Sequence, residues 1–262
     1  MHNRRWIALP IVSLLALVMV APFLYMVATS LLDDSGVLRW RTENYAAVWS
    51  AAPFARFFLN SVLLAGCAAV GQVLTSAAAA YAFARLRFPG RDRVFRAFLS
   101  VLIMPAVVLL VPRFLIINAL GWVDSYAGLI STALVSVWGI FFLRQYFLAL
   151  PRDLEDAARL DGAGEWTIFW RVMLPLAQPA LATLALVAFV DQWKNFLWPL
   201  IATRSPEMQV MEVGLARFHG VYFSNGPYQM AAAVITTLPL LIVFLVAQRY
   251  VIRGVPPAAP RS

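Results

Sequence analysis

Long apolar runs alternate with short polar loops along most of this chain. A helix needs about 20 predominantly apolar residues to cross the hydrocarbon core of a bilayer. Six stretches meet that length, so the predicted fold class is an all-α membrane protein with six transmembrane helices. They form one transmembrane domain at residues 1–254, followed by a short tail at residues 255–262. The predicted spans lie at about residues 7–31, 58–84, 94–117, 125–148, 174–201 and 229–251.

The first apolar stretch has two interpretations, because Arg4 and Arg5 precede it as they would in a secretory signal peptide. A signal-peptide core has only about 7–15 apolar residues. This run is longer and contains Pro22. We therefore interpret it as a retained first helix.

Composition agrees with a membrane location. The chain is 62% hydrophobic and only 13% charged, whereas a soluble domain carries about 25% charged residues. The net charge of +8 could indicate a nucleic-acid partner, but arginine-rich loops beside apolar spans are more simply explained by membrane orientation. We therefore expect no nucleic-acid partner. Cys67 is the only cysteine, which excludes an intrachain disulfide.

The arginines are distributed unevenly between the two sets of loops. Fourteen lie at the termini and in the loops after the second and fourth spans, whereas the opposite loops carry five arginines and six acidic residues. Cytoplasmic loops carry the excess of positive charge. Both termini and the loop at 151–173 are therefore predicted to be cytoplasmic.

The second span carries small side chains at every fourth position: Cys67, Gly71, Thr75 and Ala79. Small residues at this spacing lie on one helix face and let helix backbones approach closely within lipid. The pattern predicts a tightly packed bundle.

The loop at 151–173 is a compact polar island, with eight charged side chains between Arg152 and Arg171. Pro151 prevents the fourth span from continuing, and Asp153 with Asp156 forms a shortened capping box. Gly162 suits the left-handed residue that ends a helix. The sequence therefore predicts a helix of about two turns. A second short helix follows, with an interfacial stripe at Trp166, Phe169, Trp170 and Met173.

The island has two interpretations: an ordinary amphipathic loop, or a segment that docks into another protein. The small side chains of Ala157 and Ala158 suit insertion into a groove. The D-G-A-G turn that begins at Asp161 suits close backbone approach. These two details favour docking.

The run D-A-A-R-L-D-G-A, followed by F-W-R-V-M-L-P-L-A-Q-P, resembles the E-A-A motif of binding-protein-dependent ABC importer permeases. The resemblance is to the carbohydrate class, in particular the maltose-type second permease, and covers residues 41–254. Further matching words are Asn44-Tyr45, Asn60-Ser61, A-Y-A-F-A-R-L-R-F-P-G-R at 80–91, F-L-W-P-L-I at 196–201 and A-A-A-V-I-T-T-L-P at 231–239.

The resemblance implies that the island is a coupling helix that docks into a cytoplasmic ATPase. It implies four partners in the complex: a second six-span permease, two ATPase subunits and an extracytoplasmic solute-binding protein. ATP and Mg²⁺ would then bind to the ATPases, with no cofactor and no enzymatic activity on this chain. The location would be the cytoplasmic membrane of a bacterium or archaeon. The implied coupling residues are Glu155, Asp156, Ala157, Ala158, Asp161, Gly162 and Ala163.

The chain departs from the family pattern in three places. Asp156 stands where the motif usually has glutamate, although Glu155 is adjacent. Lys194 falls within W-K-N, where the family commonly has W-N followed by a polar residue. The end P-P-A-A-P-R-S differs from the Gly-Ala-Val-Lys-Gly-like tail that reaches the ATPases in many relatives.

The energy source must lie outside this chain. A P-loop has the pattern G-x-x-x-x-G-K-[ST], and Lys194, the only lysine, stands in V-D-Q-W-K-N. The chain therefore lacks a Walker-type ATP site. A partner ATPase or an ion gradient must drive transport.

Charged residues within spans are the remaining candidates for function, because such groups usually face a cavity or a partner. Asp191 and Lys194 lie three residues apart. They form either a structural ion pair or, with Asn195, part of the translocation path. Arg113 either reaches the headgroups or faces the same cavity. The two histidines lie apart, at His2 and His219, and predict no metal site.

Three alternatives to a sugar permease stay open. A gradient-driven secondary transporter predicts inverted repeats and more intramembrane carboxylates. A membrane-embedded enzyme predicts clustered polar residues at mid-membrane. An ABC permease for an anionic solute such as glycerol phosphate would use the charges near Lys194.

Overall fold

A computed structural model describes residues 3–33, 36–221 and 225–253 of the chain. These residues form helices and one isolated β-bridge between Leu32 and Leu38, which confirms the all-α class for the described part. The predicted tail at 255–262 lies outside the described residues. The helices are α1 (Asn3–Ser30), α2 (Glu43–Ala51), α3 (Phe54–Arg85), α4 (Arg91–Ser100), η1 (Val101–Ile103), α5 (Leu110–Ala119), α6 (Tyr126–Ile130), η2 (Ser131–Ala133), α7 (Val137–Ala149), α8 (Asp153–Leu160), α9 (Glu165–Ile168), the π-helix η3 (Phe169–Met173), α10 (Leu174–Leu176), α11 (Gln178–Trp193), α12 (Leu197–Ala202), η4 (Pro206–Met208), α13 (Met211–Val221) and α14 (Gly226–Arg253).

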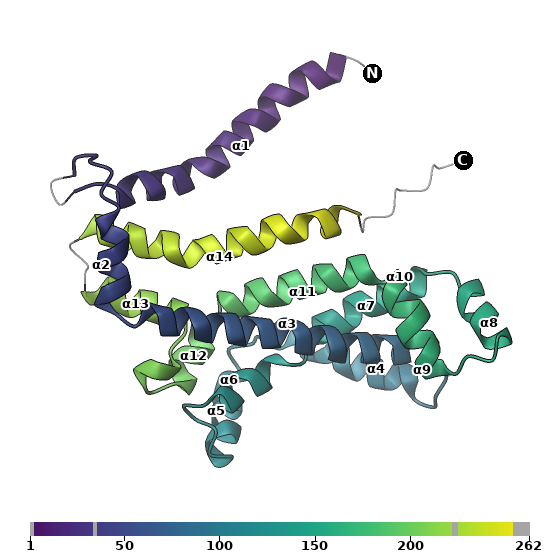
Figure 1. Ribbon diagram of the computed structural model, residues 1–262. Coiled ribbons are helices and arrows are strands. Elements are labelled where there is room, and N and C mark those ends of the chain that lie inside the picture. The colour runs from purple at the N-terminus through teal and green to yellow at the C-terminus, as the bar shows by residue number, and fades with distance from the viewer. Residues whose placement is uncertain (1–2, 34–35, 222–224, 254–262) are drawn as a thin grey trace.

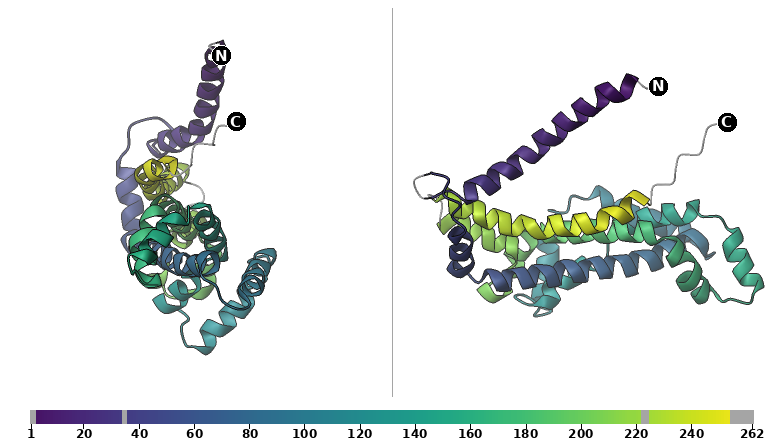
Figure 2. Two further views of the ribbon diagram at one scale, coloured as in Figure 1. Left: turned by 90° about the vertical axis from the view of Figure 1, so that its right-hand side faces the viewer. Right: turned by 45° about the horizontal axis from the view of Figure 1, so that its top comes forward.

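The long helices lie roughly side by side, with α3 packed against both α7 and α11 (Figure 1). Helix α14 packs on α11, and α1 contacts α14 before it diverges from the bundle (Figure 2). Helix α8 lies at one end of the molecule, and the first turns of α1 and the last turns of α14 point toward that same end. The arrangement therefore places the start of α1 and the end of α14 on the side of the polar island.

Four helices in the described residues are long and apolar enough to cross a membrane, and a fifth span exists if the bent pair 165–176 and 178–193 is counted as one. The predicted third span is not a continuous helix: α4 and η1 end at Ile103, and α5 begins at Leu110. Pro105 explains the break, because proline forces the residue before it into extended conformation. Met104 accordingly has φ −79° and ψ 123°.

The predicted fifth span also differs from the structure. Helix α11 ends at Trp193, and α12 begins only at Leu197. Pro199 has no N–H to donate to the carbonyl of Asn195, and its ring clashes with that carbonyl in a continuous helix. In the first turn of α12 the same proline is tolerated. At its other end, α11 is bent by 77° relative to residues 165–176, next to Pro179.

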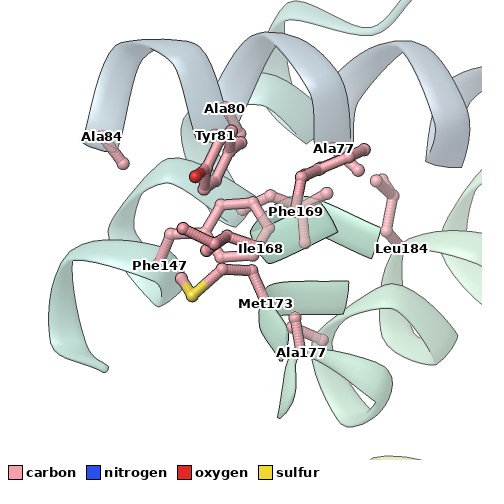
Figure 3. Close-up of a cluster of buried hydrophobic side chains, with 12 residues drawn as sticks. Ala77, Ala80, Tyr81, Ala84, Phe147, Ile168, Phe169, Met173, Ala177 and Leu184 are labelled. Carbon is pink, nitrogen blue, oxygen red and sulfur yellow. The ribbon is translucent and has the colours of Figure 1, made fainter. Parts of the chain in front are cut away.

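A buried apolar cluster joins the polar island to the bundle (Figure 3). Ile168, Phe169 and Met173 lie against small residues of α3 and large ones of α7. The alanines of α3 make room for these side chains, because they bring little bulk of their own. The segment after α8 is thereby packed into the groove between α3 and α7. The cluster consists of Ala77, Ala80, Tyr81, Ala84, Leu143, Phe147, Ile168, Phe169, Met173, Ala177, Ala180 and Leu184.

The predicted small-residue face of α3 is only partly correct. A Cβ atom at Gly71 would lie 2.5 Å from Leu134 Cδ2, and Thr75 donates a 2.9 Å hydrogen bond to the Leu134 carbonyl, so the backbone approach there is close. Cys67 and Ala79 are only partly buried, however. The most buried small residues of α3 lie on a neighbouring face, at Ala65, Ala68, Ser76, Ala77, Ala80 and Ala84.

Buried polar side chains stabilise the end of the molecule that lies away from α8. Asn44 donates 2.9 Å hydrogen bonds to the carbonyls of Ser30 and Leu32 and so attaches α2 to the end of α1. Asn60 donates 2.8 Å bonds to the carbonyls of Glu207 and Gln209. The asparagines of the Asn44-Tyr45 and Asn60-Ser61 pairs therefore have structural roles. Each donates to backbone carbonyls that would otherwise be buried without a partner.

Candidate functional site

Helix α8 is the exposed short helix that the sequence predicted, with 8 residues from Asp153 to Leu160. Gly162 has φ +83°, which confirms its predicted left-handed conformation. The predicted cap is wrong in detail: Arg152 occupies the N-cap position, and no side chain caps the helix. The acidic first turn still stabilises the helix, because carboxylates interact favourably with the positive end of the helix dipole.

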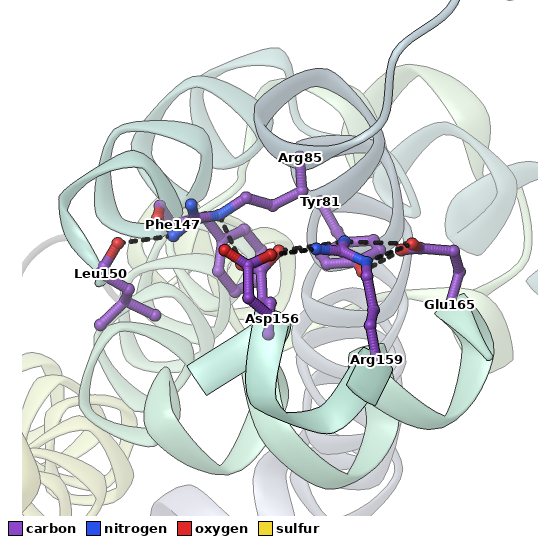
Figure 4. Close-up of polar contacts among 8 residues, drawn as sticks. Tyr81, Arg85, Phe147, Leu150, Asp156, Arg159 and Glu165 are labelled. Carbon is purple, nitrogen blue, oxygen red and sulfur yellow. Dashed lines mark hydrogen bonds and ion pairs between the residues drawn. The ribbon is translucent and has the colours of Figure 1, made fainter. Parts of the chain in front are cut away.

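A buried ion pair attaches α8 to the end of α3. Arg85 Nε lies 2.9 Å from Glu155 Oε1, and the two side chains are only 2% and 3% exposed. The same guanidinium donates hydrogen bonds to the carbonyls of Phe147 and Leu150 at the end of α7 (Figure 4). The last carbonyls of a helix have no partner within it. Arg85 therefore caps α7 and fixes α8 at once.

Arg159 extends this contact into a network with α9. Its guanidinium lies 3.0 Å from Asp156 Oδ1 and 3.0 Å from Glu165 Oε1, and Glu165 also accepts a 2.7 Å hydrogen bond from the Tyr81 hydroxyl (Figure 4). The hydrogen bond to Glu165, together with the neighbouring carboxylates, raises the pKa of Arg159 above its usual value. Networks of this kind hold their members in one arrangement. The island is thus a rigid unit on the end of the bundle.

The two faces of α8 differ. Leu160 is 90% exposed, and Ala157 and Asp161 are also exposed, as is Gly162. Ala158 instead packs against the buried cluster, together with Ala163. Ala157 and Ala158 therefore point in different directions, outward and toward the bundle, because successive helical residues differ by about 100° in direction.

The predicted aromatic stripe after α8 also divides into two parts. Trp166 is 71% exposed and Trp170 is 44% exposed. Phe169 and Met173 instead lie in the buried cluster. The π-helical turn at residues 169–173 changes the angular spacing of these positions, so they no longer form one helix face.

Asp191 and Lys194 do not form the ion pair that one interpretation predicted. Both side chains are exposed, and the ion pairs of the described residues do not include one between them. Lys194 instead interacts electrostatically with Glu212 of α13. Burial raises the pKa of Glu212, and the positive charge of Lys194 opposes that rise. Charged side chains near the end of a span usually face a cavity, a partner or the headgroups.

Asn195 and Arg113 meet at Trp198. The Arg113 guanidinium lies over the Trp198 ring at 5.1 Å from its centroid. Asn195 accepts a 3.4 Å hydrogen bond from the Trp198 backbone N–H. A guanidinium over an indole is a favourable cation–π contact. Arg113 therefore packs against α12, whose first turn is bonded to Asn195, and Lys194 takes no part in these contacts.

The residues that hold the island were not predicted from the sequence. In the sequence prediction Arg85 and Arg159 serve only as two of the fourteen cytoplasmic-side arginines, and Tyr81 and Glu165 have no role. One feature could have indicated Arg85: it stands in the last turn of a long apolar helix, where a cation can interact with helix carbonyls that have no partner. No group of three or more histidine, cysteine or acidic side chains that could hold a metal occurs within the described ranges.

Comparison with known proteins agrees with this geometry. The sequence profile of binding-protein-dependent transport system inner membrane components matches residues 72–256. The arabinooligosaccharides transport system permease protein AraQ of Bacillus subtilis is 37% identical over 81% of this chain and 76% of its own length. The diacetylchitobiose uptake system permease protein NgcG of Streptomyces coelicolor is 33% identical over 94% of this chain and 86% of its own length.

Two further similarities concern solute and fold. The sn-glycerol-3-phosphate transport system permease protein UgpE of Yersinia pestis is 34% identical over 81% of this chain and 78% of its own length. A chain in the crystal structure of a bacterial ABC transporter involved in the import of the acidic polysaccharide alginate superposes with a TM-score of 0.82. That match has 24% sequence identity and covers 95% of this chain and 98% of the other. It shows that the two chains share a fold.

Proposed function

The chain belongs to the family of binding-protein-dependent transport system inner membrane components, and from that premise we propose that it forms half of the translocation pathway of an ATP-driven importer. It is a membrane permease subunit of an ABC importer. The observation that carries the coupling role is helix α8, which is fixed to α3 by the buried Arg85–Glu155 pair and exposes its outer face at the end of the bundle. A rigid helix of this kind can transmit motion from a partner to the spans.

The proposed solute is a sugar or oligosaccharide. AraQ and NgcG, each at least 33% identical to this chain, are named for arabinooligosaccharides and diacetylchitobiose. The similarity to UgpE supports one alternative, a phosphorylated polyol such as glycerol phosphate. The two alternatives predict different roles for Lys194. A phosphate would bind favourably to its positive charge, whereas a neutral sugar does not require a cation.

The proposed complex contains this chain, a second six-span permease, two cytoplasmic ATPases and an extracytoplasmic solute-binding protein. Each permease offers one coupling helix and therefore docks one ATPase, and ATP and Mg²⁺ bind to the ATPases. We propose six spans, the third being the broken segment from α4 to α5, with both termini and α8 in the cytoplasm. The shared side of α8 and the ends of α1 and α14 supports this orientation.

Native mass spectrometry of the complex purified through this chain tests the assembly. The expected mass corresponds to one copy of this chain, one second permease and two ATPases. A transport-competent complex that contains two copies of this chain and no second permease would contradict the proposed pairing. Purification without any ATPase, together with uptake driven by an ion gradient alone, would contradict the ABC mechanism itself.

Replacing Lys194 by methionine is expected to leave folding intact and to weaken transport. Lys194 is exposed, and its electrostatic interaction with the half-buried Glu212 is not a direct ion pair, so the substitution leaves no fully buried carboxylate without its counter-charge. A hydrogen bond to a charged group contributes about 1.5–3 kcal/mol, so apparent affinity should fall roughly 10–100-fold if Lys194 binds the solute. The measurement is solute uptake per folded complex over a range of concentrations.

Two further variants separate the alternatives for Lys194. Arg204→Gln removes one positive charge from an outer loop and should transport normally. The double variant Lys194→Met with Asp191→Asn should transport as poorly as Lys194→Met alone. Full uptake by the double variant would contradict a role in the pathway and leave the two charges with an architectural role.

A further inference from the structure

A second polar feature lies between the end of α3 and the start of α4, beside the N-terminus of α8. The loop, the first turns of α4 and Arg152 line an open hollow of about 730 Å³, which we call the arginine hollow. Its aromatic wall is Phe88, and its one acidic residue is Asp92. Its cations are Arg87, Arg91, Arg93, Arg96 and Arg152.

The charge in the arginine hollow is not balanced by the protein. Asp92 pairs with Arg91, at 3.2 Å between Oδ1 and Nε. Arg87, Arg93 and Arg152 are exposed, and within the described ranges no carboxylate pairs with them. Like charges gathered in a concave site raise the local concentration of anions. The hollow is therefore built to attract a negatively charged group.

An exposed apolar stripe begins beside these arginines. Val94, Phe98 and Val101 are exposed and follow Arg91 at helical spacings that place all four on one side of α4 and η1. The adjacent side of α4 is anchored, because Phe95 is buried under the guanidinium of Arg144. A cationic headgroup site at the base of an apolar stripe matches the chemistry of a phospholipid, with its phosphate at one end and acyl chains along the helix.

We propose that the arginine hollow binds the phosphate of an anionic phospholipid in the cytoplasmic leaflet. Arginine suits this ligand because its planar guanidinium donates two parallel hydrogen bonds to phosphate oxygens. Basic pockets beside transmembrane helices on the cytoplasmic side are a recurrent form of lipid site. The location in that leaflet rests on the membrane orientation of the proposed function. Lipid retention is measured separately from transport. A failure of the lipid proposal is therefore distinguishable from a failure of the proposed transport function.

The experiment is native mass spectrometry of the complete transporter, purified in detergent with equimolar phosphatidylglycerol and phosphatidylcholine. Wild type is expected to retain phosphatidylglycerol preferentially. Arg93→Gln should lower that preference about fivefold, and Arg87→Gln with Arg93→Gln about 25-fold, as expected for independent cations near a charged membrane surface. Arg171→Gln, a cytoplasmic-side charge outside the hollow, should retain the wild-type preference.

Three outcomes would overturn the proposal. Equal losses in Arg93→Gln and Arg171→Gln would mean that only total charge matters. Displacement of the lipid by millimolar inorganic phosphate would assign the hollow to a free anion. Unchanged lipid retention with loss of the copurifying ATPase in the double variant would assign these arginines to a protein contact.

Discussion

Replacing Arg85 by methionine is expected to release helix α8 from the bundle and to abolish ATPase association. The substitution leaves Glu155 buried without its principal counter-charge and leaves the carbonyls of Phe147 and Leu150 without a donor. Removing one partner of a buried ion pair costs about 3–5 kcal/mol. Because α8 lies at the end of the molecule, the least costly response is for the island to detach and hydrate Glu155. The measurements are hydrogen exchange across residues 152–165 and the amount of ATPase that copurifies.

Two variants identify the cause of that effect. Arg87→Met removes a neighbouring but exposed arginine and should leave hydrogen exchange in the island unchanged. Adding Glu155→Leu to Arg85→Met removes the stranded charge and should restore most of the protection, since apolar replacements of buried pairs are often close to neutral. The remaining deficit of about 1–3 kcal/mol reflects the uncapped carbonyls of α7. Normal protection in Arg85→Met alone would show that the pair does not hold the island.

The sequence predicted the long helices because span length and apolarity are properties of a single segment. Helices α3 and α14 begin and end within a few residues of the expected spans. The two broken spans were not predicted, since hydropathy is insensitive to backbone hydrogen bonding. A single proline such as Pro105 or Pro199 changes the mean hydropathy of a span little, yet each removes a donor and disfavours a helical conformation upstream. Helices α2 and α13 were missed because they are too short to cross a bilayer.

Some features of the candidate site could likewise be predicted from the sequence, and others depend on tertiary packing. The length of α8 and the conformation of Gly162 follow from local chemistry, and the sequence predicted both. Arg85 and Glu155 belong to helices far apart in the chain, so their contact depends on how α3 meets the island. The orientation of α8 depends on the same tertiary contact. A periodic pattern identifies a face, but only packing shows which face is buried.

The second large effect is expected from a pair of substitutions on adjacent residues, Ala157→Trp and Ala158→Trp. Ala157 is exposed, so tryptophan there should leave the fold and the thermal stability of the permease unchanged. Ala158 packs against the buried cluster, where added bulk destabilises by about 1–3 kcal/mol or more. Ala158→Trp should therefore displace the island and lower the thermal stability of the isolated permease. Both variants should lose ATPase association, for different reasons.

The decisive measurement is ATPase binding by the Ala157→Trp permease, with its stability measured in parallel. If the outer face of α8 docks in a cleft of the ATPase, the added indole should weaken association tenfold or more, equivalent to at least about 1.4 kcal/mol. Leu160→Asp should act in the same way, because Leu160 is 90% exposed and presents an apolar contact on that face. Substrate-stimulated ATP hydrolysis at the wild-type level in both Ala157→Trp and Leu160→Asp would contradict docking through the outer face of α8. The coupling role would then have to pass through another part of the island, with Trp166 as the next exposed candidate.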